Sequence, residues 1–258
     1  MIQSVSTAED KTEYLRRLSG KPYFESTLGT HLHLFGNHPA SGWAFYLLPG
    51  SAVLELRGGS AVLCGALPGG EAGEDAREEL TGFLRFLHAD TLRTEHPLTL
   101  PGWQPAAPLT LPKGRALPLP PAPPAELVPD KAPSMLPVSR LVFAESDAEA
   151  DEFYSAACTA LAHGVGTCRA LLHNGRPVCT VGCYEQSDTE SYMAAGVTDP
   201  AWQGRGLARY LIVGLANELT AERAVRFACF PALCGFYAQL GFLQIGKIQH
   251  YTTDWNTT

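Results

Sequence analysis

The residues best suited to chemistry form a short glycine-rich run, Gln203-Gly-Arg-Gly-Leu-Ala208. Gly204 and Gly206 carry no side chains, so the backbone N–H groups at the start of a following helix can point at an anion. Arg205 and Arg209 add positive charge within one turn of that helix start. The stretch 200–217 contains no acidic residue, although the chain as a whole is acidic. This pattern predicts a phosphate site.

Two other kinds of phosphate-binding loop are also rich in glycine, and the context here argues against both. A dinucleotide-binding loop lies early in a parallel βαβ unit and is followed about 20 positions later by an acidic residue. Here the loop instead follows an expected hairpin and a third strand. A G-x-x-x-x-G-K-[ST] motif is absent from the sequence.

Turn signals and apolar spacing predict the elements that hold the loop. Asn174-Gly175 between two apolar runs indicates a type I′ hairpin. Its second strand is expected at 178–184, and a third strand at 192–198. The helix that opens at Gly204 has a leucine at every fourth position, which predicts a buried stripe. These leucines are Leu207, Leu211, Leu215 and Leu219.

The elements on either side complete a regular order. Upstream, the pattern favours a strand at 140–144 and a helix at 147–162. Downstream, it favours a strand at 225–229, a helix that begins at Pro231 and ends at Gly241, and a last strand at 242–251.

This order and two motifs resemble the GNAT acyltransferase superfamily. The run 203–208 fits the family's Q/R-x-x-G-x-G/A loop, which grips the pyrophosphate of acetyl-coenzyme A. Phe236-Tyr-Ala-Gln-Leu-Gly-Phe242 resembles its F-Y-x-x-x-G-F ending. The resemblance covers roughly 136–258. It implies an α+β fold with a mixed sheet and an acetyl-CoA-dependent N-acetyltransferase that transfers the acyl group directly in a ternary complex.

The resemblance also implies a role for each matching residue. Val197 and Thr198 stand where family members splay a strand and present N–H groups to the pantetheine and thioester. The residues expected to bind the cofactor are Val197, Thr198, Gln203, Gly204, Arg205, Gly206, Leu207 and Ala208. One departure concerns the other side of the cofactor. Many relatives carry an asparagine upstream of the motif's tyrosine, and Phe230-Pro-Ala-Leu-Cys234 has none.

Tyr237 matches the family tyrosine that protonates the departing sulfur. A phenol with a pKa of about 10 can serve a thiolate whose acid has a pKa of about 8.5. The structural alternative is that Tyr237 only packs in the core. A base must also take a proton from the amine, and we expect Glu190 in this role, with Glu185 and Asp188 as alternatives.

The first half of the chain repeats the same plan. Strands are expected at 43–48, 52–56 and 61–67, followed by a helix at 75–88. We therefore predict a degenerate GNAT-like domain at 1–100, a proline-rich linker at 101–134 and a catalytic domain at 135–258. The start of the first helix is rich in acids, namely Glu71, Glu74, Asp75, Glu78 and Glu79, against Arg77 alone. Since like charges repel, only the second domain is expected to bind coenzyme A.

Composition and charge bear on the class of partner and on the location of the protein. With 258 residues, a net charge of −7 and a pI near 5.6, the chain lacks the basic face of a nucleic-acid-binding protein. No apolar run is long enough to cross a membrane and no secretion signal is visible, so a cytoplasmic location is expected. The seven cysteines show no paired pattern and are expected as reduced thiols.

Two further expectations concern ligands and partners. His31, His33 and His38 lack a third acidic or cysteine ligand nearby, so we expect a surface strand or packing rather than a metal site. The acceptor is expected to be a small-molecule or peptide amine, and the protein a monomer or homodimer without nucleic-acid or membrane partners. The alternative is an acyl-CoA-binding regulatory module without turnover.

Overall fold

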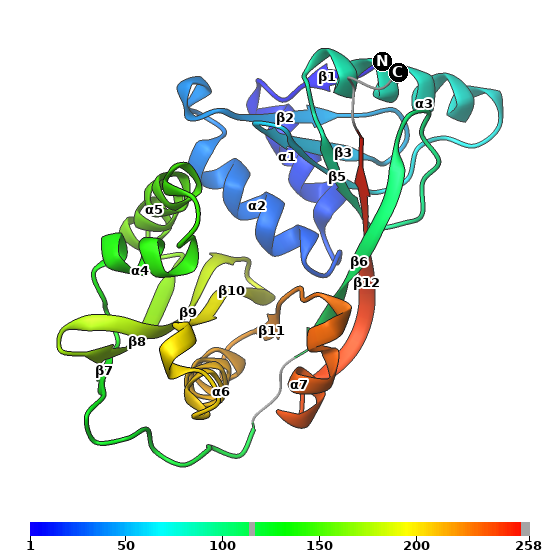
Figure 1. Ribbon diagram of the computed structural model, residues 1–258. Coiled ribbons are helices and arrows are strands. Elements are labelled where there is room, and N and C mark those ends of the chain that lie inside the picture. Colours follow the sequence, from blue (N-terminus) through cyan, green and yellow to red (C-terminus); the bar gives the residue numbers. More distant parts are fainter. Residues whose placement is uncertain (114–116, 254–258) are drawn as a thin grey trace. The chain divides into compact units, whose positions relative to one another are not determined.

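A computed structural model describes residues 1–113 and 117–253 of the chain (Figure 1). It divides into two compact units. Unit 1 contains 1–111, 228–234 and the residues from 245 onward, and unit 2 contains 112–227 and 235–244. Each unit combines helices with a sheet of mixed strand direction, so the expected α+β class is confirmed.

Unit 1 is built on a sheet whose strand order is β1-β2-β3-β4-β5-β12. Only β4 and β5 run parallel, and the other neighbouring strands are antiparallel. In chain order its elements are β1 Gln3–Ser4, α1 Ala8–Leu18, α2 Phe24–Phe35, η1 Pro39–Ser41, β2 Trp43–Leu47, β3 Val53–Arg57, β4 Ser60–Cys64, α3 Glu71–Phe86 and β5 Thr91–Thr94, with β12 Leu243–Thr252 from the chain's end. The three expected strands and the expected helix of this half are therefore confirmed.

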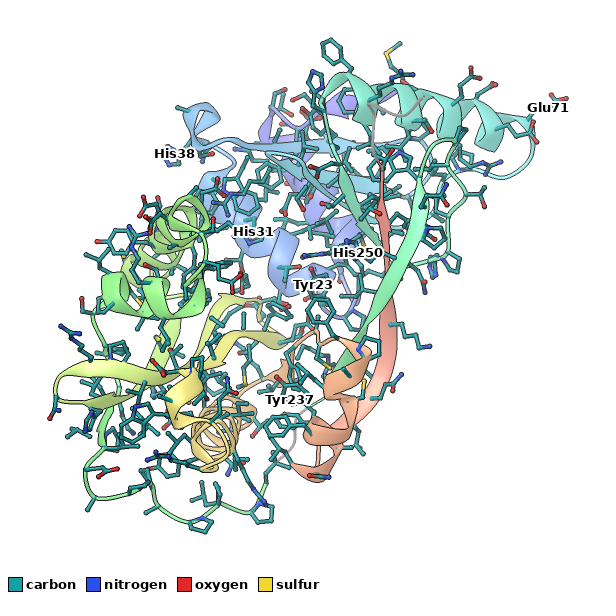
Figure 2. The ribbon with its side chains drawn as sticks, viewed as in Figure 1. Tyr23, His31, His38, Glu71, Tyr237 and His250 are labelled. Atoms are coloured by element: carbon teal, nitrogen blue, oxygen red, sulfur yellow. The ribbon has the colours of Figure 1, made fainter. Side chains whose placement is uncertain are left out.

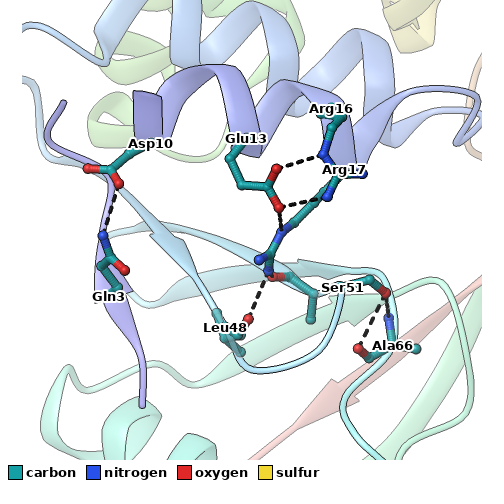
Figure 3. Close-up of polar contacts among 9 residues, drawn as sticks. Gln3, Asp10, Glu13, Arg16, Arg17, Leu48, Ser51 and Ala66 are labelled. Carbon is teal, nitrogen blue, oxygen red and sulfur yellow. Dashed lines mark hydrogen bonds and ion pairs between the residues drawn. The ribbon is translucent and has the colours of Figure 1, made fainter. Parts of the chain in front are cut away.

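Helices α1 and α2 had no counterpart in the sequence-based assignment. A reciprocal capping box starts α1, because Thr7 accepts from the Asp10 N–H and the Asp10 carboxylate accepts from the Thr7 N–H. Glu13 then pairs with Arg16 and Arg17, and Arg17 donates to the carbonyl of Leu48 at 2.8 Å (Figure 3). These contacts tie α1 to the turn between β2 and β3.

The strands of unit 2 follow the order β7-β8-β9-β10-β11, in which β10 and β11 run parallel and the other neighbours antiparallel. In Figure 1, α4 and α5 lie on one face of β8–β10 and α6 on the other. Its elements are β7 Val128–Asp130, α4 Met135–Val142, α5 Asp147–Ala162, β8 Thr167–His173, β9 Arg176–Gln186, β10 Glu190–Thr198, η2 Pro200–Trp202, α6 Leu207–Thr220, β11 Ala224–Arg226 and α7 Cys234–Gln239. Most of β6 Gln104–Lys113 and all of η3 Pro231–Leu233 belong to unit 1.

Most of the expected elements of the second half are confirmed. Asn174 and Gly175 have φ angles of 50° and 77°, as a type I′ hairpin requires. The strand expected at 140–144 is wrong, because the chain forms helix α4 there. Met135, Val138 and Ser139 are the buried residues of α4, and their spacing of three and one is helical rather than alternating.

The segment expected as a linker, 101–134, contains β6 and β7, and the run Leu117–Pro124 between them has no helix or strand. The division into 1–100, 101–134 and 135–258 stays a prediction. All seven cysteines are free, as expected, and five of them are buried. Within the described part of the chain, no helix is both long and apolar enough to span a membrane.

Candidate functional site

Strand β10 is bent by a bulge just before the glycine-rich loop. Ala194 pairs with Gly182, and Val197 pairs with Thr180, so two residues of β10 lie opposite one residue of β9. Ala195, in the bulge, has a left-handed φ of 54°. A bulge of this kind turns the strand and redirects its N–H and C=O groups.

On its other edge, β10 parts from its parallel neighbour. Pairing with β11 ends at Tyr192 and Arg226, whereas β10 continues to Thr198. We call the edge of β10 from Met193 to Thr198, where the pairing with β11 has ended, the wedge. Parallel strands that diverge leave backbone polar groups that an extended ligand can reach. Val197 and Thr198 lie on this edge, and their role in binding the pantetheine and thioester stays a prediction.

The loop after β10 keeps its glycines in a conformation that favours glycine. Gly204 and Gly206 both have φ of 75°, and a Cβ added to either would meet no atom within 4 Å. Gly206 is the N-cap of α6, which has no side-chain cap and no acidic residue in its first turn. The first N–H groups of α6 therefore receive no side-chain cap and lie at the positive end of the helix dipole.

Neighbouring side chains hold the loop in place. The Gln203 amide donates to the carbonyl of Thr198 at 3.2 Å. The Trp202 ring lies 4.7 Å from the His173 ring and 4.6 Å beneath the Arg205 guanidinium. Arg205 also lies 3.8 Å from a Glu126 carboxylate oxygen, so part of its charge is balanced within the unit. Trp202 thus anchors the loop to the β8–β9 hairpin.

A cavity of about 790 Å³ lies beside this loop. Val197, Thr198 and Gln203 line one wall, and the corner between α4 and α5 lines another. Leu207 is almost fully buried, so only its backbone can face a ligand. The structure therefore brings together the expected cofactor residues around one cavity and one helix start.

Tyr237 lies at the β11 side of the wedge. Its ring is 4.2 Å from the ring of Phe227, which directly follows β11, and 6.1 Å from that of Phe242. Figure 2 shows Tyr237 on the short helix α7. The backbone carbonyl of Tyr237 accepts from the Phe242 N–H at 3.1 Å, which fixes the turn after α7.

The three candidate bases have different surroundings. Glu190 is only 4% exposed, and its Oε2 lies 3.3 Å from Nε of Arg226. Glu185, on β9, is half-buried and lies directly across from Tyr192 of β10. Asp188 is exposed in the turn between β9 and β10. The identity of the base stays a prediction.

The corresponding region of unit 1 is closed. Its parallel strands β4 and β5 stay paired to the end of β5 at Thr94. The next residue, Glu95, accepts from the Gly65 N–H at 3.2 Å and from Lys21 Nζ at 2.8 Å. Burial opposes ionisation of Glu95, but these two hydrogen bonds hold its pKa below the ordinary value. Sequence reasoning missed this closure, whose only signal was an acid immediately after a strand.

The helix start of unit 1 also differs in charge. Glu71 and Glu74 lie in the first turn of α3, and Figure 2 shows Glu71 at the outer end of that helix. At Gly73, an added Cβ would lie 2.1 Å from the Pro68 carbonyl oxygen, so the chain itself covers this turn. Glu71 and Glu74 therefore put negative charge at the helix end where an anion would bind.

The histidines expected on a surface strand lie elsewhere. His31 and His33 belong to helix α2, so the strand expectation is wrong, and His31 contacts Glu55 at 3.0 Å. Figure 2 shows His38 apart from His31. Among the described residues, no group of His, Cys, Asp and Glu side chains has the arrangement of a metal site.

Comparison with known proteins agrees with this geometry. Residues 134–242 match the model of the acetyltransferase (GNAT) family. These residues form a GNAT domain. No curated protein sequence matches the chain significantly.

Solved structures extend the likeness to the whole chain. A tandem GNAT protein from the clavulanic acid biosynthesis pathway superposes with a TM-score of 0.67 at 15% identity, over 98% of each chain. A GCN5-related N-acetyltransferase from Sphaerobacter thermophilus gives 0.65 at 13% identity, over 97% of this chain and 94% of the other. One from Kribbella flavida gives 0.59 at 15% identity, over 80% and 88%. The fold is therefore that of two GNAT-like units in one chain, as the resemblance implied.

Proposed function

We propose that this protein is an acetyl-CoA-dependent N-acetyltransferase whose GNAT domain binds the donor. The observation that carries this proposal is the combination, in unit 2, of the wedge with the uncapped start of α6. A ligand with an extended amide-bearing arm and a pyrophosphate matches both features at once. Coenzyme A has this composition.

In the proposed complex, the N–H groups of Gly206, Leu207 and Ala208 bind the pyrophosphate, with Gly204 and Arg205 in the same loop. Gln203 keeps the loop against Thr198. The pantetheine arm lies along the wedge and pairs with the backbone of Val197 and Thr198. This mode of binding adds a strand-like segment to an unpaired strand edge.

The transfer step needs two proton movements. The amine nitrogen of the acceptor attacks the thioester carbon, the carbon–sulfur bond breaks, and the sulfur leaves with the bonding electrons. Tyr237 gives its hydroxyl proton to that sulfur, and Glu190 takes the proton that the amine loses. Tyr237 is supported by its place beside Phe227 at the β11 side of the wedge.

Unit 1 is proposed to bind no coenzyme A. Support comes from the Glu95 side chain that bridges the ends of β4 and β5, and from the acids in the first turn of α3. Binding a dianionic pyrophosphate beside Glu71 and Glu74 costs free energy, because like charges repel.

The acceptor is proposed to be a primary amine on a small molecule or a peptide. We further propose a cytoplasmic protein that acts as a monomer or homodimer. These points follow from composition and from the reaction type.

The decisive experiment combines calorimetric titration of the full chain with acetyl-CoA and a thiol-release assay over a panel of amines. One binding site per chain and thiol release with at least one amine are expected. Absence of any acetyl-CoA binding would refute the proposal. Binding without release across the panel would instead favour the acyl-CoA-binding module without turnover.

A further inference from the structure

Leu117, the first residue of the proline-rich run Leu117–Pro124, is hydrogen-bonded to helix α6 of the GNAT domain. The side chain of Asn217, on α6, accepts from the Leu117 N–H at 2.7 Å and donates to the Leu117 carbonyl at 2.8 Å. Both polar groups of one residue are therefore bound by one amide side chain, as a neighbouring strand would bind them. This fixes the position of Leu117 against the helix that begins at the phosphate loop.

The Leu117 side chain reaches the turn that follows Tyr237. It is only 7% exposed, and its Cδ2 lies 2.7 Å from the place that a Cβ on Gly241 would occupy. Gly241 has φ of 94°, a backbone conformation that favours glycine, and its lack of a side chain leaves room for Leu117. The same turn contains the hydrogen bond from the Phe242 N–H to the Tyr237 carbonyl.

The contact at Leu117 is concentrated, because the run separates from α6 immediately afterwards. A cavity of about 530 Å³ lies between Leu119, Pro120 and Ala122 on one side and the surface of α6 on the other. Leu119, two residues after Leu117, is 68% exposed. The contact between this run and α6 therefore depends on the hydrogen bonds of Asn217 rather than on continuous packing of side chains.

We propose that Leu117 and Asn217 are positioning residues for Tyr237. Asn217 holds Leu117 on α6, and Leu117 holds the Gly241 turn, so the tyrosine is kept at a set position relative to the helix that binds the donor's pyrophosphate. The sequence assigned this run only a connecting role. The inference rests on the proposed function for its catalytic readout, and on hydrogen exchange for a readout that needs no activity.

The kinetic test compares Asn217→Ala and Leu117→Ala with Leu117→Met and Leu119→Ala. The first two are expected to lower kcat about tenfold or more while KM for acetyl-CoA stays within about twofold, because misplacement of a reacting group costs rate rather than donor affinity. Leu117→Met, which keeps the side-chain volume, restores kcat. Leu119→Ala, the same chemical change at an exposed leucine, leaves kcat at the wild-type value.

The double variant Asn217→Ala/Leu117→Ala separates positioning from general weakening. If both residues act through one contact, its kcat is no lower than that of the more damaged single variant. Independent losses that multiply, or a change confined to KM for acetyl-CoA, would overturn the proposal. Thermal melting of each variant checks that the chain is folded.

Hydrogen–deuterium exchange tests the positioning role of Leu117 and Asn217 even if the protein acetylates no amine of the panel. In Asn217→Ala, the amides of Gly241 and Phe242 are expected to exchange about tenfold faster or more, because the turn loses its support. The amides of β8 and β9 serve as internal references. Unchanged exchange at Gly241 and Phe242 would refute the positioning role of Leu117 and Asn217. Absence of acetyl-CoA binding would refute only the proposed function.

Discussion

Tyr237 carries the proposed acid chemistry with its hydroxyl, whereas its ring packs against Phe227 and Phe242. These two roles can be separated, because phenylalanine keeps the ring and removes the proton. The structural alternative, in which Tyr237 only packs, predicts little loss on this substitution. Core packing of the ring therefore does not decide between the two roles, and kinetics does.

Tyr237→Phe is expected to lower kcat by about 10² or more, in line with the loss of a positioned general acid. KM for acetyl-CoA and the melting temperature should stay close to wild type, since the aromatic contacts remain. Steady-state kinetics with the best amine of the panel measures both constants. Unchanged kcat would show that another group or water protonates the sulfur.

Glu190→Gln is expected to lower kcat/KM for the amine by about 10², because the amide cannot accept the proton. Glu185→Gln is the matched comparison, the same change on the neighbouring strand. If Glu185→Gln causes the larger loss, the base is on β9. The stability of Glu190→Gln must be measured as well, since its partner Arg226 loses a buried counter-charge.

The N-termini of α3 and α6 differ in charge between the two units. Helix α3 begins with Glu71 and Glu74, which stabilise it through its dipole, whereas α6 begins with Gly206 and no acid. The second arrangement leaves the helix less stabilised and its N–H groups available. Affinity for an anion and stability of the free helix therefore compete for the same groups.

Arg209→Glu places an acid in the first turn of α6 and tests this competition. It should weaken acetyl-CoA binding about tenfold or more, while free-protein stability stays equal or rises by about 0.3–1 kcal/mol. Calorimetric titration and urea unfolding measure the two effects. Arg85→Glu, an equal charge change near the end of α3, is the control for net charge and should leave affinity unchanged.

Glu95→Gln tests the closure between β4 and β5. Because the pKa of folded Glu95 lies below its ordinary value of 4.5, its contribution is present above that value and is lost as the pH falls through the folded pKa. The variant should therefore lose about 1–3 kcal/mol of unfolding free energy near neutral pH. The difference from wild type should shrink well below pH 4.5.

Urea unfolding across this pH range measures the Glu95 effect, and Glu78→Gln, at an exposed carboxylate of α3, is the matched control. If Glu95→Gln lost the same unfolding free energy at every pH, the charge of Glu95 would not contribute to stability. Coenzyme A binding to unit 1 is not expected to appear in Glu95→Gln, since the acids of α3 remain.

At the scale of the molecule, neither unit is one continuous stretch of chain. The last strand, β12, pairs with β5 from Gln249 to Thr252. Tyr251 is buried in the same core as Leu54, Leu80 and Leu92, and its hydroxyl accepts from the Leu98 N–H at 2.8 Å. Unit 1 therefore depends on residues that the chain supplies only at its end.

Truncation after Gln244 should destabilise unit 1 by several kcal/mol, since it removes the strand that pairs with β5 and the buried Tyr251. Loss of a large buried aromatic side chain alone costs about 3–5 kcal/mol. Truncation after Thr253 keeps β12 and is the control. Hydrogen exchange at the amides of β5 measures the effect. Wild-type protection of β5 in the shorter chain would contradict the prediction.

Local signals in the sequence were sufficient for many elements. Asn174-Gly175 specified its hairpin because only a left-handed pair fits that turn. The leucine stripe specified α6, and the two motifs at 203–208 and 236–242 indicated the GNAT resemblance. Helices α1 and α2 and the helical state of 135–142 were missed, although the buried residues of α1 and of 135–142 have helical spacing.

What the sequence determined by itself is therefore local: which turns form, which helix starts carry acids, and which loop can hold a phosphate. The tertiary structure alone decided where strands part and where they stay together. It closed β4 and β5 with Glu95, ended the pairing of β10 with β11 at the wedge, and placed Leu117 between Asn217 and Gly241. These contacts join residues 30 to 124 positions apart in the printed sequence. Their geometry depends on the packing of whole units, which no short pattern encodes.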